Sequence, residues 1–364
     1  MKFFAFFLPQ FHEIPENNKW WGDGFTEWVN VKSAKQLYKG HVQPKHPRGG
    51  HYYNLLEKDT VVKQTSLMKN YNVSGMIYYH YYFKGKLLLE KPAENLLKWK
   101  DIKQPFFFCW ANHNWFRTWS GEKTLLIKQE YGTEADWEKH FQYLLPFFKD
   151  DRYEKKNNMP LFMIFDSEIE KKEEMFGYMD KRCKECGFSG LYLIETFNPN
   201  QGKNSLVENY LVFNQKCSSV TKDVHLREPS TGSSAYHLSY RIDFFSKIHR
   251  RIRTKIGIII NKPYVYRLSG EKIYKLMIND CSKIKGIHGV FFEWDNTPRH
   301  KERGYVIKPP LRKTFFEYLT SIKNDEYVFI NAWNEWCEGM MLEPTEENGT
   351  IYLEWIRDWF IVSE

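Results

Sequence analysis

The residues best suited to chemistry lie in residues 327–344, which read YVFINAWNEWCEGMMLEP. The stretch opens with an apolar run, residues 328–330, which is the pattern of a buried parallel strand. Amides, tryptophans and two carboxylates follow, with Glu335 and Glu338 three residues apart. Because carboxylates among aromatic rings at the end of a buried strand are costly to keep, the pattern indicates a pair used in acid and base chemistry.

A carboxyl group beside aromatic surface loses hydration, which raises its pKa, and a second carboxylate nearby separates the two pKa values further. Aromatic rings beside such a pair also suit a sugar, whose C–H faces stack while its hydroxyls need acceptors. Two carboxyls that flank a glycosidic bond can act as acid and base, or as acid and nucleophile. The alternative is a strand end with a solvated Glu pair and tryptophans that belong to the core.

Two further carboxylates follow the apolar run near residue 290. Glu293 and Asp295 could take the place of either member of the pair, although Asp295 in D-N-T can instead cap a turn through its side chain. Aromatic residues that could stack on a sugar also occur at expected strand ends, and at least one of them is expected in the core. These are Trp110, Trp115, Trp294 and Trp333.

Eight short apolar runs would position these residues, and helical patterns lie between them. Most runs are bounded by Gly or Pro, and the intervening segments are long enough for crossover helices, such as those over 60–70, 134–148, 168–186 and 272–285. Eight such units predict an α/β protein with a (β/α)8 TIM barrel. The expected strands are residues 3–8, 75–79, 105–110, 161–165, 190–194, 210–213, 289–292 and 327–330, of which the sixth has the weakest pattern.

Polar and aromatic residues follow nearly every expected strand, where barrel geometry brings the carboxyl ends together. We therefore expect one active site at this face of the barrel, with Glu335 and Glu338 as its catalytic residues. The side chains expected to bind substrate there are Gln10, His12, Trp28, His80, Tyr82, Trp110, Asn112, His113, Asn114, Trp294, Asp295, Asn296, Arg299, Trp333 and Asn334.

Composition narrows the choice of function. Subtracting 45 Asp and Glu from 53 Lys and Arg gives a net charge of +8 in 364 residues, an excess that agrees with an anionic partner without identifying one. Aromatic residues make up 18% of the chain, which favours a binding cleft lined by rings. The motifs of P-loop enzymes, simple dinucleotide enzymes, zincin proteases, serine hydrolases and D-x-D transferases do not occur. No cofactor, metal or nucleic acid is expected.

The start, MKFFAFFLPQFHEIPE, has a short apolar part that Pro9 ends, so we interpret it as a first strand and not as a signal peptide. No run has the length of a membrane span. The six cysteines are scattered and are expected to be reduced thiols of a cytoplasmic protein. Cys183 and Cys186 form half of a zinc motif, which we interpret as coincidence because no second pair accompanies them.

A single catalytic domain is expected over residues 1–364, with an insertion at 216–264 between strands six and seven. Residues 218–234 are rich in Ser, Thr and Gly and are expected to form a loop. Residues 240–255 predict a helix with an apolar stripe and a basic face. That helix could contact a membrane surface or a polyanion, but a helix packed on the barrel with a solvated basic face is the preferred interpretation.

Four ordered blocks resemble a known family: FLPQFHEIPENNKWWGDGFTEWVNV, CWANHNW, GVFFEWDNTPR and INAWNEWCEGMMLEP. The chain resembles, from about Phe4 to Glu343, the WbsX-like proteins of polysaccharide gene clusters, which are relatives of glycoside hydrolase family 99. The resemblance implies a (β/α)8 barrel and a retaining, metal-free glycosidase that cleaves α-mannosidic bonds inside a chain. By the same resemblance, Glu338 matches the acid/base, and Glu335 matches the residue that assists attack by the sugar's 2-hydroxyl to give a 1,2-anhydro intermediate. The block CWANHNW departs from the family pattern W-A-N-E-N-W, because His113 stands where relatives carry a carboxylate.

Three functions follow from these observations. The first is a retaining glycoside hydrolase that acts on α-linked glycans of a surface polysaccharide. The second is a glycosyltransferase on the same barrel, which would extend an O-antigen or capsular repeat from a nucleotide sugar or a lipid-linked glycan, with peripheral membrane contact. The third is a carbohydrate-binding protein without catalysis, against which the paired carboxylates argue.

Overall fold

The computed structural model describes residues 1–117, 124–166, 169–196, 219–221, 252, 256, 265–281 and 286–363 of this α/β protein. Its main parallel strands are β1 (Lys2–Phe7), β2 (Gly75–Phe83), β4 (Phe106–Trp110), β8 (Met159–Ile164), β9 (Tyr192–Thr196), β10 (Ser219–Thr221), β12 (His288–Phe291) and β15 (Tyr327–Asn331). The helices are α1 (Pro15–Trp21), α2 (Glu27–Ser33), α3 (Lys58–Asn70), α4 (Lys91–Lys98), α5 (Glu134–Phe148), α6 (Lys172–Glu185), α10 (Gly270–Asp280), α11 (Thr297–His300), α12 (Arg312–Ser321) and α13 (Ile351–Ser363).

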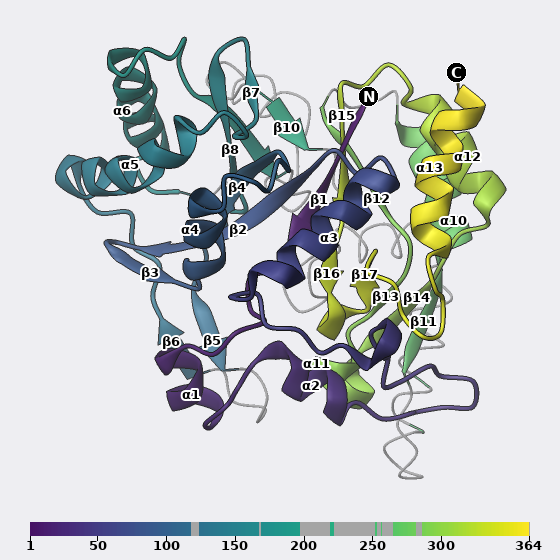
Figure 1. Cartoon of the computed structure of the whole chain (residues 1–364). Coiled ribbons are helices and arrows are strands. Elements are labelled where there is room, and N and C mark those ends of the chain that lie inside the picture. Colours follow the sequence, from purple (N-terminus) through teal and green to yellow (C-terminus); the bar gives the residue numbers. More distant parts are fainter. Residues whose placement is uncertain are drawn as a thin grey trace.

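Short strands and 3-10 turns complete the structure (Figure 1). The short strands are β3 (Lys86–Leu88), β5 (Trp115–Arg117), β6 (Thr124–Ile127), β7 (Lys155–Lys156), β11 (Tyr266–Ser269), β13 (Trp294–Asp295), β14 (Tyr305–Lys308), β16 (Asn334–Glu335) and β17 (Met340–Met341). Single 3-10 turns are η1 (Arg48–Gly50), η3 (Lys301–Arg303) and η4 (Trp336–Glu338).

The eight main strands pair in the order β10-β9-β8-β4-β2-β1-β15-β12, and every neighbouring pair is parallel. The last strand of the chain, β15, therefore lies beside the first, as the barrel interpretation requires. Seven of the expected strands are confirmed within a few residues. The expected sixth strand, residues 210–213, lies outside the described residues, and β10 pairs with β9 in its place. A pairing of β10 with β12, which would close the sheet, is not among those of the described residues.

Aromatic side chains fill the space that the curved sheet encloses. The ring of Phe107 on β4 lies 5.3 Å from that of Phe4 on β1 and 5.7 Å from that of Phe329 on β15. Since β2 and β1 lie between β4 and β15 in the sheet, these contacts span its concave side. Gly75 at the start of β2 makes the room: a Cβ there would lie 2.2 Å from the Phe4 ring. The core therefore sits inside the sheet.

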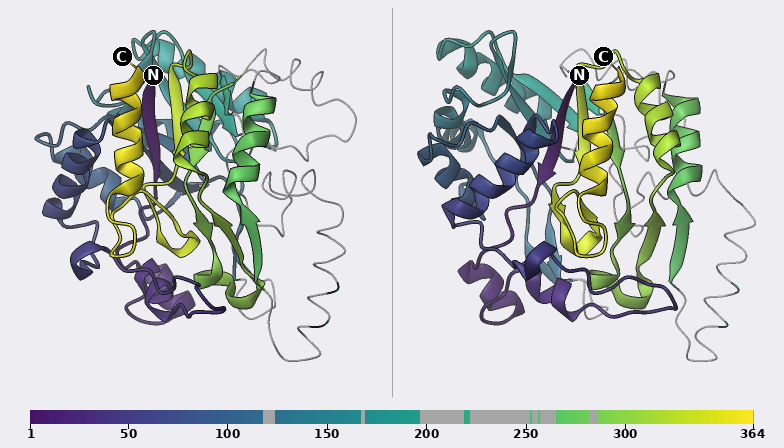
Figure 2. Two further views of the ribbon diagram at one scale, coloured as in Figure 1. Left: turned by 90° about the vertical axis from the view of Figure 1, so that its right-hand side faces the viewer. Right: turned by 45° about the vertical axis from the view of Figure 1, so that its right-hand side comes forward.

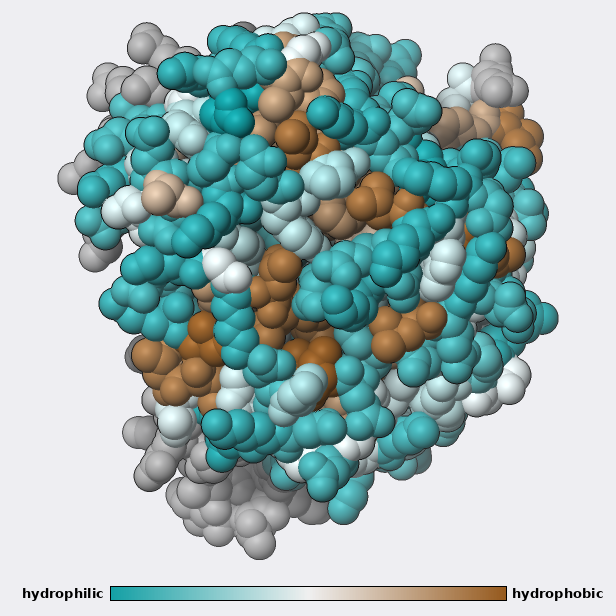
Figure 3. Space-filling view, turned by 60° about the vertical axis from the view of Figure 1, so that its left-hand side comes forward, coloured by the Kyte–Doolittle hydropathy of each residue, from teal (hydrophilic) through white to brown (hydrophobic). Residues whose placement is uncertain are grey.

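Helices cover the outside of the sheet (Figure 2). The Phe3 ring on β1 meets Phe360 of α13 at 5.4 Å, and the Phe106 ring on β4 meets Phe147 of α5 at 6.5 Å. The expected helices α3, α5, α6 and α10 are confirmed, with ends shifted by a few residues. On the face drawn in Figure 3, hydrophilic residues dominate, and hydrophobic residues reach the surface in separate patches.

Strand β2 sends alternate side chains to opposite sides of the sheet. Tyr79 stacks on Phe6 at 5.4 Å inside the sheet, while the neighbouring His80 points outward to α5. There, His80 Nε2 lies 2.9 Å from His140 Nε2, and the Tyr82 ring stacks on the His140 ring at 3.8 Å. The expectation that His80 and Tyr82 line the substrate site is therefore wrong, because their position in the strand turns them toward a helix.

This buried histidine pair should make the fold sensitive to acid. Burial lowers the pKa of His80 from its ordinary value of 6.5 to about 3 and lowers the pKa of His140 as well. The unfolded chain therefore takes up protons that the folded chain does not, and stability should fall as the pH drops from about 6.5 toward 3. Urea unfolding across this range should show the loss. The variant His140→Gln keeps a hydrogen-bonding side chain but does not titrate, so its free energy of unfolding should depend less on pH. If the free energy of unfolding of the variant falls with pH as steeply as that of the native protein, the histidine pair does not cause the acid sensitivity.

The expected insertion, residues 216–264, contributes only β10 and residues 252 and 256 to the described part of the chain. The expected loop at 218–234 and the expected basic helix at 240–255 otherwise lie outside the described residues. No helix in the described part of the chain combines the length and the hydropathy that a membrane crossing needs.

Candidate active site

The motif after β15 is tied to the end of β1 through Asn334. Its Oδ1 accepts a hydrogen bond of 2.7 Å from the Leu8 amide, and its Nδ2 donates to the Leu8 carbonyl at 3.0 Å. The Asn334 side chain is fully buried, so its polar groups are committed to the backbone. Asn334 therefore positions the neighbouring Glu335 and does not itself face a substrate.

The buried carboxylate of Glu343 holds the motif in place through hydrogen bonds. Glu343 accepts hydrogen bonds from Tyr53 Oη at 2.6 Å, Gln64 Nε2 at 2.6 Å, Trp336 Nε1 at 2.6 Å and Trp333 Nε1 at 3.1 Å. Burial raises the pKa of Glu343 to about 7 in spite of these donors. Trp333 and Trp336 are buried in the core, so neither offers a ring face to a sugar, and the stacking role expected of Trp333 is wrong.

Gly339 lets the motif approach β13 closely. Its φ of +59° lies in the left-handed region, and a Cβ there would lie 2.8 Å from Asp295 Cβ and 2.9 Å from the Asp295 amide nitrogen. Residue 339 must therefore be glycine for the backbone after Glu338 to lie this close to Asp295.

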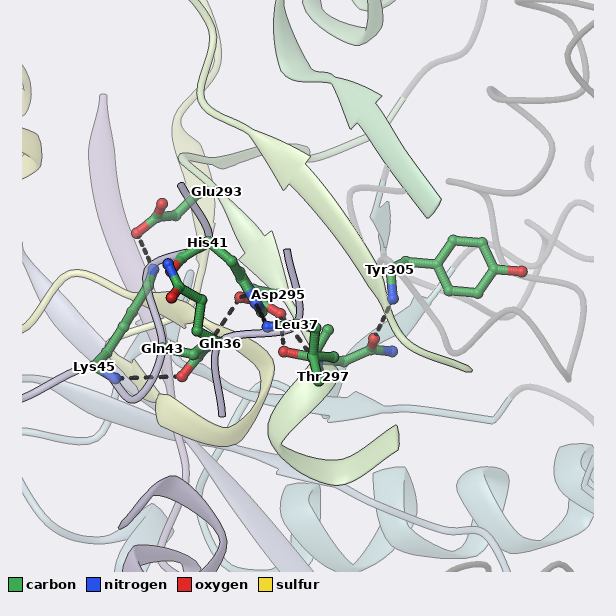
Figure 4. Close-up of polar contacts among 10 residues, drawn as sticks. Gln36, Leu37, His41, Gln43, Lys45, Glu293, Asp295, Thr297 and Tyr305 are labelled. Carbon is green, nitrogen blue, oxygen red and sulfur yellow. Dashed lines mark hydrogen bonds and ion pairs between the residues drawn. The ribbon is translucent and has the colours of Figure 1, made fainter. Parts of the chain in front are cut away.

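Asp295 is held by its neighbours and is not free for a substrate (Figure 4). Its Oδ2 accepts from His41 Nε2 at 2.8 Å and Gln43 Nε2 at 2.9 Å, and its Oδ1 accepts from the Thr297 amide at 3.0 Å and Thr297 Oγ1 at 2.6 Å. Burial pushes the pKa of Asp295 upward, but the donors from His41, Thr297 and Gln43 outweigh it and lower the pKa overall. Asp295 thus caps the turn that leads into α11, as the alternative interpretation of D-N-T stated.

Glu293, which follows β12, also has hydrogen-bond partners. Glu293 Oε1 accepts hydrogen bonds from Lys45 Nζ and from Asn348 Nδ2, the latter at 3.1 Å. The loop that carries His41, Gln43 and Lys45 therefore holds the residues that follow β12 in place. With these partners, neither Glu293 nor Asp295 replaces a member of the Glu335 and Glu338 pair.

Arg299, from α11, joins the two expected catalytic residues. Its Nη1 lies 2.5 Å from Glu338 Oε1, and its Nη2 lies 3.8 Å from Glu335 Oε2. The same Nη2 lies 3.3 Å from Glu27 Oε1, at the start of α2. One guanidinium therefore faces three carboxylates, one from α2 and two from the motif after β15. We call this group the carboxylate cluster: Glu27, Glu335, Glu338 and Arg299.

The two glutamates of the motif differ in environment. The Glu335 side chain is 9% exposed, against 16% for Glu338, and Glu335 Oε2 is buried. Burial raises the pKa of Glu335 to about 8, and the negative charges of Glu338 and Glu27 add to the rise while Arg299 opposes it. The close ion pair with Arg299 favours the ionised form of Glu338. At neutral pH the cluster can thus hold a proton on Glu335 beside an ionised Glu338.

Residues that the sequence analysis did not select also reach this cluster. Burial raises the pKa of both Tyr79 and Tyr81, which lie on the inward side of β2, and the charge of Glu335 adds to the rise. Gln10 Nε2 donates to Tyr81 Oη at 3.3 Å, which places Gln10 beside Tyr81, and its role in substrate binding stays a prediction. Strand alternation could have identified Tyr79 and Tyr81, had the inward side of β2 been known. Nothing in the sequence identified Glu27 as a functional residue, because acidic residues are common in the first turn of any helix.

Most of the other residues expected at the site make structural contacts within the fold instead. Trp28, Trp110 and Trp294 are buried, and the first two donate through Nε1 to the carbonyls of Tyr53 at 2.8 Å and Tyr82 at 3.0 Å. Asn112 joins the ends of β4 and β8, since its Oδ1 accepts from the Asp166 amide at 2.7 Å and its Nδ2 donates to the Asp166 carbonyl at 2.6 Å.

Four expected residues remain. His12 is buried with Nδ1 at 2.9 Å from the Pro9 carbonyl, and burial lowers its pKa. Asn296 Oδ1 accepts from the Tyr305 amide at 2.7 Å. Asn114 is exposed and its Oδ1 accepts from the Gln129 amide at 2.6 Å, while the half-buried His113 ring lies 5.2 Å from the Phe165 ring. Of these four, Asn296 contacts the carboxylate cluster through its backbone, since its carbonyl accepts from the Arg299 amide at 3.2 Å.

Residues 3–356 match the family described as "Glycosyltransferase WbsX". The chain is 27% identical over 369 residues to "Uncharacterized protein WxcX" of Xanthomonas campestris pv. campestris, in strains B100 and ATCC 33913 alike, with 97% of this chain and 48% of the relative aligned. The chain thus spans about half the length of these curated relatives.

Solved structures show a similar fold. The GH99 endo-alpha-mannosidase from Bacteroides thetaiotaomicron matches with a TM-score of 0.55 over 99% of this chain and 96% of its own, at 12% sequence identity. A structure described as "Glycoside hydrolase-like protein" matches with a TM-score of 0.59 over 99% and 93%, also at 12% identity. At this identity the likeness concerns the fold.

Proposed function

The chain belongs to the WbsX family of carbohydrate-active enzymes, and we propose that it is a retaining glycoside hydrolase that uses Glu335 and Glu338 to cleave α-linked glycans of a surface polysaccharide. The observation that carries the proposal is the carboxylate cluster at the carboxyl end of β15. There, a buried Glu335 with a pKa of about 8 stands beside Glu338, which is paired with Arg299 at 2.5 Å. Two carboxyls held in different protonation states are what acid and base catalysis at a glycosidic bond requires.

We also propose that the parallel sheet closes into a (β/α)8 barrel within a single catalytic domain. The strand order, with β15 beside β1, supports closure, as does the contact of Phe107 with Phe329 across the concave side. The fold shared with the endo-alpha-mannosidase adds support. In such a barrel the site at the carboxyl ends of the strands is where glycan would bind.

The charge environment bears on the role of each glutamate. The resemblance to glycoside hydrolase family 99 implies that Glu338 donates the proton to the leaving oxygen. The surroundings of the two residues support the opposite distribution before the reaction, with the proton on Glu335 and the charge on Glu338. For Glu338 to act as the acid, a proton must reach it and its ion pair with Arg299 must open. We therefore propose that the pair shares one proton whose position substrate binding decides.

A glycosyltransferase is the second candidate, because the family's own description names that activity. In this case the cluster would activate an acceptor hydroxyl, and a nucleotide sugar or lipid-linked donor would bind beside it. The two proposals differ in whether a donor is required.

Mass spectrometry of glycans incubated with the protein distinguishes the two. The panel would hold α-linked mannans, α-linked rhamnans and lipid-linked repeat units, each with and without UDP- and GDP-sugars, beside the Glu338→Gln variant. Shortened glycans without a donor, absent with the variant, would support the hydrolase. Products lengthened only in the presence of a donor would replace it with the transferase, and bound but unchanged glycans would contradict both.

The pH dependence of turnover should report the proton on Glu335. Activity should fall above about pH 8, where Glu335 ionises and can no longer donate. Because the charge of Glu27 raises the pKa of Glu335, Glu27→Gln should move this alkaline limb to lower pH by about half a unit, roughly 0.7 kcal/mol. Rates measured from pH 5 to 10 on both proteins test this. A limb that stays in place, or moves to higher pH, would contradict the coupling of Glu27 to Glu335.

A further inference from the structure

A group of aromatic residues remains partly exposed beside the carboxylate cluster. Trp20 and Trp21 end α1, while Trp115 and Phe116 begin β5. All four are partly exposed, whereas Trp28, Trp110, Trp294, Trp333 and Trp336 are buried. We call the partly exposed group the aromatic ledge: Trp20, Trp21, Trp115 and Phe116.

The ledge is held in a fixed arrangement. The Trp20 and Trp115 rings meet edge to face with centroids 5.8 Å apart. Arg117 Nη2 donates to the Trp20 carbonyl at 2.7 Å, and its guanidinium lies 5.4 Å from the centre of the Trp21 ring. These contacts bind the end of α1 to the hairpin of β5 and β6. Rings that are already positioned lose little conformational entropy when a ligand stacks on them.

Tyr81 connects the ledge to the carboxylate cluster. Its ring lies 5.0 Å from the Trp115 ring, and the charges of Glu335, Arg299 and Glu27 all act on its hydroxyl. The chain order agrees, because α1 follows β1, Tyr81 lies on β2 and β5 follows β4, and these three strands are adjacent in the sheet. Figure 1 shows α1, β5 and β6 at the same end of the molecule as α2 and α11.

The ledge combines ring faces, a cation and an exposed aliphatic side chain. Leu125 of β6 is 47% exposed and pairs in register with Phe116. Exposed apolar patches that are rimmed by polar residues mark interaction sites, and ligand-binding grooves are one kind of such site. A sugar ring fits such a surface, because its C–H face packs on an indole while its hydroxyls reach the solvent and the guanidinium of Arg117.

From these contacts we infer that the aromatic ledge binds further pyranose rings of the glycan whose bond lies at the carboxylate cluster. This inference rests on the proposed function and extends it from the cleaved bond to its neighbours along the chain. A glycan that spans Tyr81 to Trp20 occupies the cluster and the ledge together, so the protein selects substrates of several residues over disaccharides.

The test is the dependence of binding on glycan length. The probes are α-linked manno- and rhamno-oligosaccharides of two to six residues, titrated calorimetrically into the Glu338→Gln protein, in which the proposed cleavage is blocked. Affinity should rise at least about 10-fold from two to six residues. Adding Trp20→Ala or Trp115→Ala should remove most of that gain on the hexasaccharides and change disaccharide binding less than two-fold. Trp115→Phe, which keeps a ring, should retain most of the gain.

Trp99→Ala is the matched control. Trp99 is also partly exposed, but its carbonyl accepts from Arg152, whose own carbonyl accepts from the Phe106 amide at the amino end of β4. Its removal should leave the length dependence unchanged. Hexasaccharide binding by the ledge variants within two-fold of the parent would overturn the inference, as would absence of binding at every length. Length-dependent binding that the ledge variants lose, in a native protein that never cleaves, would uphold the ledge while the proposed hydrolase fails.

Discussion

Replacing either Glu335 or Glu338 with glutamine is expected to lower turnover by about 10²- to 10⁴-fold, the usual contribution of a positioned acid or base. Glutamine keeps the shape of the side chain but can neither donate nor accept the proton that the pair shares. For Glu335 the loss should arise without unfolding, because the wild-type side chain is buried with a pKa of about 8 and is largely neutral at pH 7. Initial rates on whichever glycan is processed, together with thermal unfolding curves, measure both effects.

The double variant Glu335→Gln/Glu338→Gln should be little worse than either single variant, because residues that act as a unit lose their contribution at the first replacement. Glu354→Gln is the matched control: Glu354 accepts from Thr350 Oγ1 at 2.7 Å at the start of α13 and has no described contact with the cluster. Its turnover should stay near that of the native protein. A Glu335 or Glu338 variant that keeps more than a third of native turnover would remove that residue from the catalytic assignment.

Replacing Arg299 with methionine is expected to cost about 3–5 kcal/mol of stability, the range measured when one partner of a buried ion pair is removed. Arg299 contacts Glu338 at 2.5 Å, Glu27 at 3.3 Å and Glu335 at 3.8 Å, and its own pKa rises well above its usual range because the charges of Glu27, Glu338 and Glu335 outweigh the effect of burial. Methionine fills similar space and leaves these carboxylates without a cation. Chemical unfolding at a series of pH values measures the loss.

The size of this loss should depend on pH in a defined direction. Without the guanidinium, the carboxylates gain protons more readily in the folded protein, so the destabilisation should be greatest above pH 8 and smaller near pH 5. Adding Glu27→Gln to Arg299→Met should recover part of the stability by removing one buried charge. Arg357→Met, an exposed change on α13 beside Asp358, should stay within roughly 0.5 kcal/mol of the native protein. A loss independent of pH, with no recovery in the double variant, would show that packing and not charge explains the effect.

The sequence by itself determined the class of the fold and the order of its strands. Runs such as residues 3–8 and 327–330 are apolar on both faces, and only strands covered on both sides keep such runs, so they predict a parallel sheet under helices. The same pattern identified residues 335 and 338 as polar residues that follow a buried strand. Local composition suffices for such conclusions because burial and backbone geometry act on neighbouring residues.

Only the tertiary structure decided which polar and aromatic side chains face the cluster. His80 and Tyr79 are adjacent, yet His80 meets His140 outside the sheet and Tyr79 stacks on Phe6 inside it, because alternation along β2 fixes opposite sides and the sequence did not reveal which side is inward. Asn334 was expected to bind substrate and instead binds the Leu8 backbone. Whether a polar group is free depends on partners that are distant in the chain.

Glu27 shows the same dependence most clearly. In the sequence it is an ordinary acidic residue at the start of a helix, and it becomes part of the cluster only because α2, α11 and the motif after β15 converge on Arg299. Buried charges are tolerated where others compensate them, and that compensation is a property of positions in space. The chain's pattern of residue types could therefore predict the glutamate pair and the strand that carries it, while the charge balance that sets the protonation of Glu335 exists only in the folded protein.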